Sequence, residues 1–82
     1  MTEAERIAAG LSVGDRVRVL AAYGDGTADR RKFSAEALFR LVQIGLADPL
    51  ERDSRREVAR AKLNHLGLAV RDILKQSEPS NG

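Results

Sequence analysis

The sequence contains no cysteine and only one histidine, His65. Without cysteine the chain can form neither a disulfide nor a thiolate metal site, and one imidazole leaves a metal ion short of nitrogen ligands. The Gly24-Asp25-Gly26 turn lacks the spacing and the lysine of a phosphate-binding loop, and Asp25 and Asp29 do not fit the spacing of a calcium-binding loop. We therefore expect no cofactor, no small-molecule substrate and no enzymatic activity.

Long apolar stretches and aromatic side chains are also scarce. No apolar run approaches the roughly 20 residues that a membrane-spanning helix needs, and the first residues lack the basic segment and apolar core of a signal peptide. These absences favour a cytoplasmic protein with no membrane partner. Because the aromatic residues are only Tyr23, Phe33 and Phe39, the core must be mainly aliphatic. At 82 residues the chain is one domain at most. We expect this domain to cover residues 1–76, with a disordered polar tail at residues 77–82.

The N-terminal third contains signals for two helices. Thr2 can cap a short first helix that ends near Gly10. Ser12 can cap a second helix, with Asp15 completing an approximate capping box, and the glycine-rich turn after Tyr23 ends it. The second helix carries apolar residues at the three-to-four spacing of a buried stripe. These are Val13, Val17, Leu20 and Ala21.

The strongest helix signal covers residues 34–44. Ser34 is a good N-cap, Leu38, Leu41 and Val42 recur on one face, and Gly45 supplies a left-handed exit. The preceding residues 27–33 fit either a basic loop or a short helical turn, and we favour the helical turn.

A β-hairpin is expected next. Residues 46–52 form an edge strand that tolerates Pro49, residues 52–56 form the turn, and residues 57–63 form the return strand. Strict alternation would place Ala59, Ala61 and Leu63 on one face of the return strand and Val58, Arg60 and Lys62 on the other. Asn64 then caps a last helix, whose apolar positions are Leu66, Val70, Ile73 and Leu74.

This order of elements, together with the run from Leu63 to Arg71, resembles the winged helix-turn-helix domains of small bacterial and phage regulators. Leu63-Asn64-His65-Leu66-Gly67 is similar to a common family pattern, Leu-Thr-x-x-Gly, with Asn64 in the position of the threonine cap. The resemblance covers about residues 12–75. It implies that the helix ending at Gly45-Leu46 is a recognition helix and that the hairpin is the wing. The predicted fold class is mainly α with a small β-hairpin, winged helix-turn-helix-like.

Positive charge gathers at two places in the sequence. Residues 52–62 hold five cations against two carboxylates, a net charge of +3, whereas the whole chain has +2. The second cluster precedes the proposed recognition helix. Cations that neutralise DNA phosphates release counterions and so provide affinity without sequence information. Charged residues on an edge strand also prevent aggregation, and this alternative stays open.

Base readout would come from the outward face of residues 34–44, where Arg40 can contact guanine and Gln43 adenine. We therefore predict a regulator that binds double-stranded DNA, as a homodimer joined through Ile7, Leu11 and Ile73. The predicted DNA contacts are Arg30, Arg31, Lys32, Arg40, Gln43, Arg52, Arg55, Arg56, Arg60 and Lys62.

The alternative is a winged-helix protein-interaction module that does not bind DNA. It rests on the apolar residues Phe39, Val42 and Ile44 and on the shortage of polar side chains that could read bases.

Overall fold

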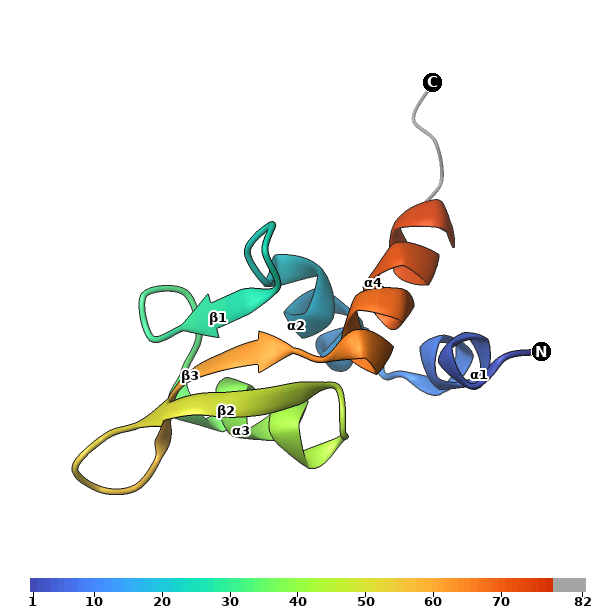
Figure 1. Cartoon of the computed structure of the whole chain (residues 1–82). Coiled ribbons are helices and arrows are strands. Elements are labelled where there is room, and N and C mark those ends of the chain that lie inside the picture. Colours follow the sequence, from blue (N-terminus) through green and yellow to red (C-terminus); the bar gives the residue numbers. More distant parts are fainter. Residues whose placement is uncertain (78–82) are drawn as a thin grey trace.

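The computed structural model describes residues 1–77, which form a small mixed α/β domain (Figure 1). Its helices and strands, in chain order, are α1 (Glu3–Gly10), α2 (Val13–Ala21), β1 (Thr27–Asp29), α3 (Ala35–Gln43), β2 (Ala47–Arg52), β3 (Val58–Leu63) and α4 (His65–Ser77). The predicted helices and hairpin are present, and the structure adds a third strand, β1. Ser77, expected in the tail, is the last residue of α4, and the rest of the predicted tail lies outside the described residues.

The three strands form an antiparallel sheet in the order β1-β3-β2. The helical turn predicted for residues 27–33 is wrong, because Thr27–Asp29 pairs with β3 and Ala28 is buried opposite Ala61. Pairing with β3 places the backbone of these residues in the hydrogen-bonded ladder of the sheet. A single helical turn of the same length would be unstable by itself. After β1 the chain turns directly into α3, with the amide of Phe33 donating to the carbonyl oxygen of Asp29 at 2.9 Å.

The helix boundaries follow the local signals. The side chains of Thr2, Ser12 and Ser34 each accept a hydrogen bond from the backbone N–H three residues later, and Asn64 does the same for Gly67. Gly45 leaves α3 with φ +80°, the left-handed exit expected, and Leu46 folds into the core.

The buried stripe predicted for α2 is wrong at Val13 and Val17, whereas Leu20 and Ala21 are partly buried and pack against the core as expected. Val13 and Val17 are 77% and 60% exposed, whereas Asp15 and Val19 face inward. The helix is rotated because Asp15 pairs with an arginine of α3, as described below, and this turns the two valines toward solvent.

The alternation predicted for β3 holds from Arg60 to Leu63 but fails at Val58. The register between β2 and β3 shifts twice, so that Glu51 pairs with Arg60 but Arg52 pairs with Val58. The irregularity turns Val58 to the helix-facing side, where it is 1% exposed.

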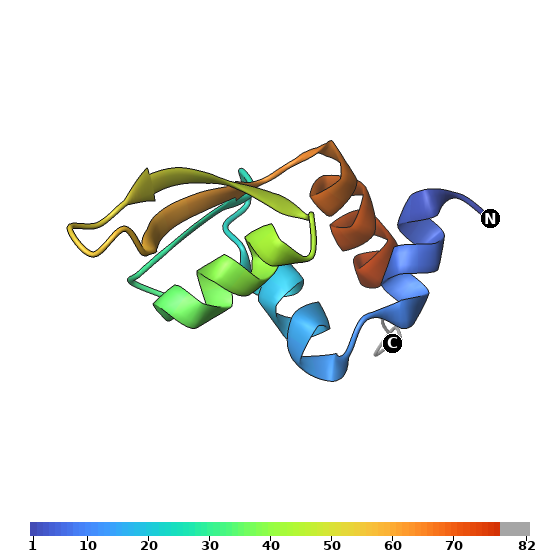
Figure 2. The same ribbon diagram turned by 90° about the horizontal axis from the view of Figure 1, so that it is seen from below.

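The helices pack at two places around the sheet (Figure 2). α3 runs along one face, where Leu38 and Leu41 are fully buried together with Ala61 of β3. α1 packs on α4 at the end of the molecule that lies farthest from the β2–β3 loop (Figure 2). This arrangement leaves the hairpin loop and the start of α3 together at the other end.

Candidate nucleic-acid interface

A shallow groove joins the hairpin loop to α3. It has a volume of about 260 Å³ and is lined by Ala35, Glu36, Phe39, Arg52, Arg56, Glu57 and Val58. Two of the predicted wing cations, Arg52 and Arg56, therefore share a surface with the proposed recognition helix.

Asp53 organises the hairpin loop. One carboxylate oxygen accepts the backbone N–H groups of Arg55 at 2.9 Å and Glu57 at 3.0 Å, and the other accepts Nη2 of Arg30 at 2.6 Å. These contacts, first of all the amide of Glu57, hold the pKa of Asp53 below its usual value. Arg30 also donates from Nε to the carbonyl oxygen of Val58 at 3.2 Å. The two basic clusters of the sequence therefore meet through Arg30, whose own charge is already paired.

The arginines in and near the hairpin loop differ in whether their side chains have partners. Arg52 donates from Nη1 to the carbonyl oxygen of Arg56 at 2.9 Å, which fixes its guanidinium at the base of the loop. Arg56 itself has φ +62°, a left-handed conformation that disfavours residues with a Cβ. Within residues 1–77, no hydrogen bond or ion pair engages the side chains of Arg31, Arg55 or Arg56.

Arg60 and Lys62 lie elsewhere. They alternate with the buried Ala61 and so occupy the sheet face that points away from α3. Carboxylates flank them across the sheet: Arg60 stands in register with Asp29 and Glu51, and its Nη1 is 3.1 Å from Oε1 of Glu51. Lys62 is in register with Asp48. The expectation that both cations flank the recognition helix is therefore wrong: Arg60 is paired with Glu51, and Lys62 stands opposite Asp48 on the neighbouring strand.

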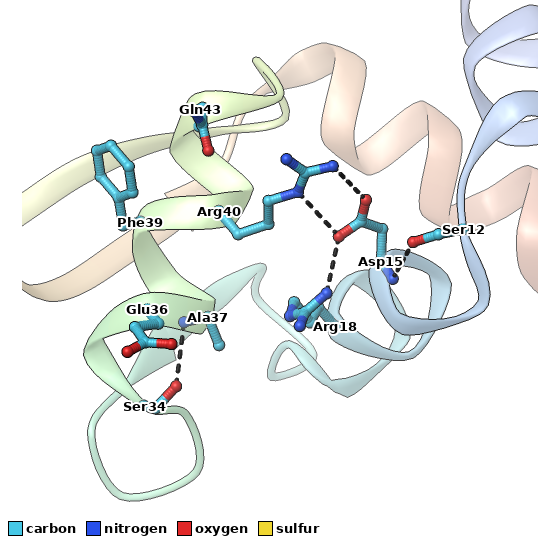
Figure 3. Close-up of a pocket in the computed structure, with 9 residues that line it drawn as sticks. All are labelled: Ser12, Asp15, Arg18, Ser34, Glu36, Ala37, Phe39, Arg40 and Gln43. Atoms are coloured by element: carbon cyan, nitrogen blue, oxygen red, sulfur yellow. Dashed lines mark hydrogen bonds and ion pairs between the residues drawn. The ribbon is translucent and has the colours of Figure 1, made fainter.

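Arg40 is held by a buried carboxylate (Figure 3). Its Nε and Nη2 donate to the two oxygens of Asp15 at 3.3 and 3.1 Å, and Nη1 of Arg18 lies 2.8 Å from one of them. Asp15 is only 3% exposed, yet the hydrogen bond from Arg40 holds its pKa below the usual value against the effect of burial. Arg40, predicted to read guanine, thus joins α3 to α2 as a structural residue.

The other predicted contacts are less constrained. Gln43 is exposed on α3 and, with Glu36 and Arg40, lines a depression of about 480 Å³ between α2 and α3. Lys32 lies over the ring of Tyr23, with Nζ 5.3 Å from the ring centroid. Arg40 and Gln43 are the two predicted DNA contacts on α3. Because Arg40 is bound to Asp15, the side chain of Gln43 is the one that stays available to read a base.

Protein-family models, curated proteins and solved structures contain no match to this chain. The candidate interface therefore rests on its own geometry. Among residues 1–77, no three His, Cys, Asp or Glu side chains are grouped so that they could hold a metal ion, and no helix is long and apolar enough to cross a membrane.

The predicted dimer residues are largely used by the fold of a single chain. Ile7, Leu11 and Ile73 are partly buried and pack against the core. The homodimer stays a prediction.

Sequence reasoning missed two ion pairs that decide which cations are available. The sequence predicts Asp15 only as part of a helix cap, but its carboxylate reaches an arginine 25 residues later. It predicts Asp53 only as part of a turn, and this residue also binds Arg30, 23 residues earlier. The only local signal is the i, i+3 spacing of Asp15 and Arg18, which gives the helix contact but not the partner on α3.

Proposed function

We propose that this chain is a winged-helix-like DNA-binding module of the kind found in transcriptional regulators, with phosphate contacts from the hairpin loop and limited base readout from α3. In this proposal the hairpin is the wing and α3 is the recognition helix. Support comes from the sheet order, in which the central strand β3 joins the hairpin to β1, and from the position of α3 beside it. A five-residue turn after β1 takes the place of the helix that precedes the recognition helix in the family.

The observation that carries the proposal is a set of arginines around the loop whose side chains have no ion pair among the residues that the structure describes. Arg55 and Arg56 extend from the loop, and Arg31 lies next to Arg30, which is tied to the loop through Asp53. An arginine without a carboxylate partner can donate to phosphate without first breaking an ion pair. Gln43 remains as the base-reading side chain, so sequence preference should be modest.

Fluorescence anisotropy with a labelled duplex of about 20 base pairs, long enough to span a single small module, tests this function. Three phosphate contacts predict that log K falls with log salt concentration with a slope of about −3, and Arg55→Gln should reduce the slope by about 1. Lys62→Gln is the matched control because it removes a cation from the opposite face of the sheet. Absence of duplex binding at low salt, or equal losses in both variants, would reject the proposed interface.

A protein-interaction module is the second candidate. The observation that favours it is Phe39, which is 52% exposed. Val42 and Ile44 add little to such a surface, since both are partly buried and pack against the core. Of the three apolar residues predicted for this surface, Phe39 is therefore the one that is exposed, and it lines the same groove as Arg52 and Arg56.

A further inference from the structure

Phe39 is the one aromatic ring among residues 1–77 that is largely open to solvent. Its ring projects from the flank of α3 opposite to Arg40 (Figure 3). Phe39 lines the groove that contains Arg52 and Arg56, and it also borders the depression between α2 and α3. Ala35 and Val58 extend the apolar floor of this groove. Phe39 is not among the residues that form the core or pack against it.

The rim of the groove combines both signs of charge. Arg52 and Arg56 line it with Glu36 and Glu57, and the guanidinium of Arg52 is fixed by its hydrogen bond to the carbonyl oxygen of Arg56. A purely apolar segment would bury these charged groups without giving them polar partners.

An unpaired nucleotide can contact the aromatic ring, the carboxylates and the arginines of the groove at the same time. Its face stacks on an aromatic ring, its exocyclic amino group can donate to a carboxylate, and its phosphates can accept from the arginines. In an intact duplex the faces of the bases are covered by stacking, so the ring of Phe39 cannot reach them. Few side chains on α3 can read a duplex, because Arg40 is held by Asp15.

We propose that the groove between Phe39 and the hairpin loop binds an unpaired base, so that this chain prefers single-stranded DNA to intact duplex. This inference rests on the proposed function and names its substrate class. Phe39 and Arg56 contact the base and its phosphates, and Arg52 contributes through its fixed guanidinium.

The test compares a labelled single strand of about 15 nucleotides with the same sequence as a duplex, by anisotropy at matched low salt. The single strand should bind about tenfold more tightly, and Phe39→Leu should lose about tenfold on the single strand while leaving duplex binding almost unchanged. Val17→Leu, which changes an exposed apolar residue on α2, is the control. Because Phe39 is half exposed, the melting curve of Phe39→Leu should match that of the wild type.

A second variant gives a direct readout. The sequence has no tryptophan, so Phe39→Trp introduces a single indole in the groove. Its fluorescence should be quenched by the single strand through stacking, and its affinity should be retained or increased. Quenching that is equal with the duplex would contradict the inference.

The outcomes separate the two proposals. If no DNA binds at low salt, both fail. If the duplex binds through Arg55 but the single strand has no advantage and Phe39→Leu changes neither affinity, only the inference fails. A concentration-dependent dimer that Phe39→Leu dissociates would also overturn it, because a second copy of the chain would then occupy the groove.

Discussion

Gly67 shows how one missing side chain sets the distance between two elements. It lies in the first turn of α4, where a Cβ would overlap the carbonyl oxygen of Leu46 and press on the side chain of Leu63. The same carbonyl oxygen accepts the N–H of Asn64 at 3.0 Å, and Nδ2 of Asn64 donates to the carbonyl oxygen of Gly45 at 2.9 Å. The start of α4 is therefore locked to the turn that follows α3.

Gly67→Ala should strongly destabilise the protein. Alanine improves helix propensity by up to about 1 kcal/mol, but the overlap with backbone forces α4 away from the turn and should lower the free energy of unfolding by about 2–3 kcal/mol. Urea unfolding followed by far-UV circular dichroism measures this difference. Gly10→Ala is the matched control, because a Cβ at this position would meet no heavy atom within 4 Å, and it should be neutral or slightly stabilising. Equal stabilities of the two variants would contradict the packing argument.

Among the elements, the hairpin loop is shaped by Asp53 and carries a local strain at Arg56. The carboxylate of Asp53 accepts two backbone N–H groups of the loop, so the loop has a defined shape without a core of its own. Arg56 adopts φ +62°, where glycine would be favoured. Strained backbone is often found at functional sites, and here it directs an arginine into the groove.

Arg56→Gly should separate stability from binding. Glycine relieves the left-handed strain and should raise the free energy of unfolding by about 0.5–1 kcal/mol, while DNA affinity falls because a cation is lost. Arg55→Gly is the control, since Arg55 does not have a positive φ. It should weaken binding to a similar extent without the gain in stability. A stability loss in Arg56→Gly, seen as a lower urea midpoint, would be the opposite of the expected result.

For the molecule as a whole, the carboxylates make stability depend on pH. Hydrogen bonds and ion pairs lower the pKa of Asp15, Asp25 and Asp53 in the folded state. The unfolded chain then binds more protons in acid, so the stabilisation is complete above the unfolded pKa of about 4 and is lost as pH falls through the lower folded values. Asp15 should contribute most, because it is the buried member and is shared by Arg40 and Arg18.

Urea midpoints measured between about pH 6 and about pH 2 test this dependence. The wild-type midpoint should fall steadily below about pH 4. Asp15→Asn should lower stability at about pH 6 by about 1–3 kcal/mol, since the two arginines lose the negative charge and one of the two acceptor oxygens of the carboxylate. It should also make the loss of stability below about pH 4 less steep. Asp25→Asn, at an exposed turn, should have a smaller effect on how steeply the urea midpoint falls in acid. If the urea midpoint of Asp15→Asn depends on pH as steeply as that of the wild type, Asp15 is not the main acid-sensitive group.

The features that could be predicted from the amino-acid sequence are those that depend on neighbouring residues. Thr2, Ser12, Ser34 and Asn64 cap helices because a side-chain oxygen reaches a backbone N–H three residues away, whatever the rest of the chain does. Gly45 ends α3 for an equally local reason, and the hairpin follows from its turn and flanking strands.

The third strand and the partners of the charged residues depend instead on how distant segments pack. Thr27–Asp29 is a strand because β3, more than 30 residues later in the chain, offers it hydrogen bonds. Asp15 removes Arg40 from the predicted DNA surface, and Arg60 and Lys62 lie on the opposite face of the sheet. Sequence shows how many cations a segment has, but only packing brings distant carboxylates to some of them and, within residues 1–77, leaves the side chains of Arg31, Arg55 and Arg56 without an ion pair.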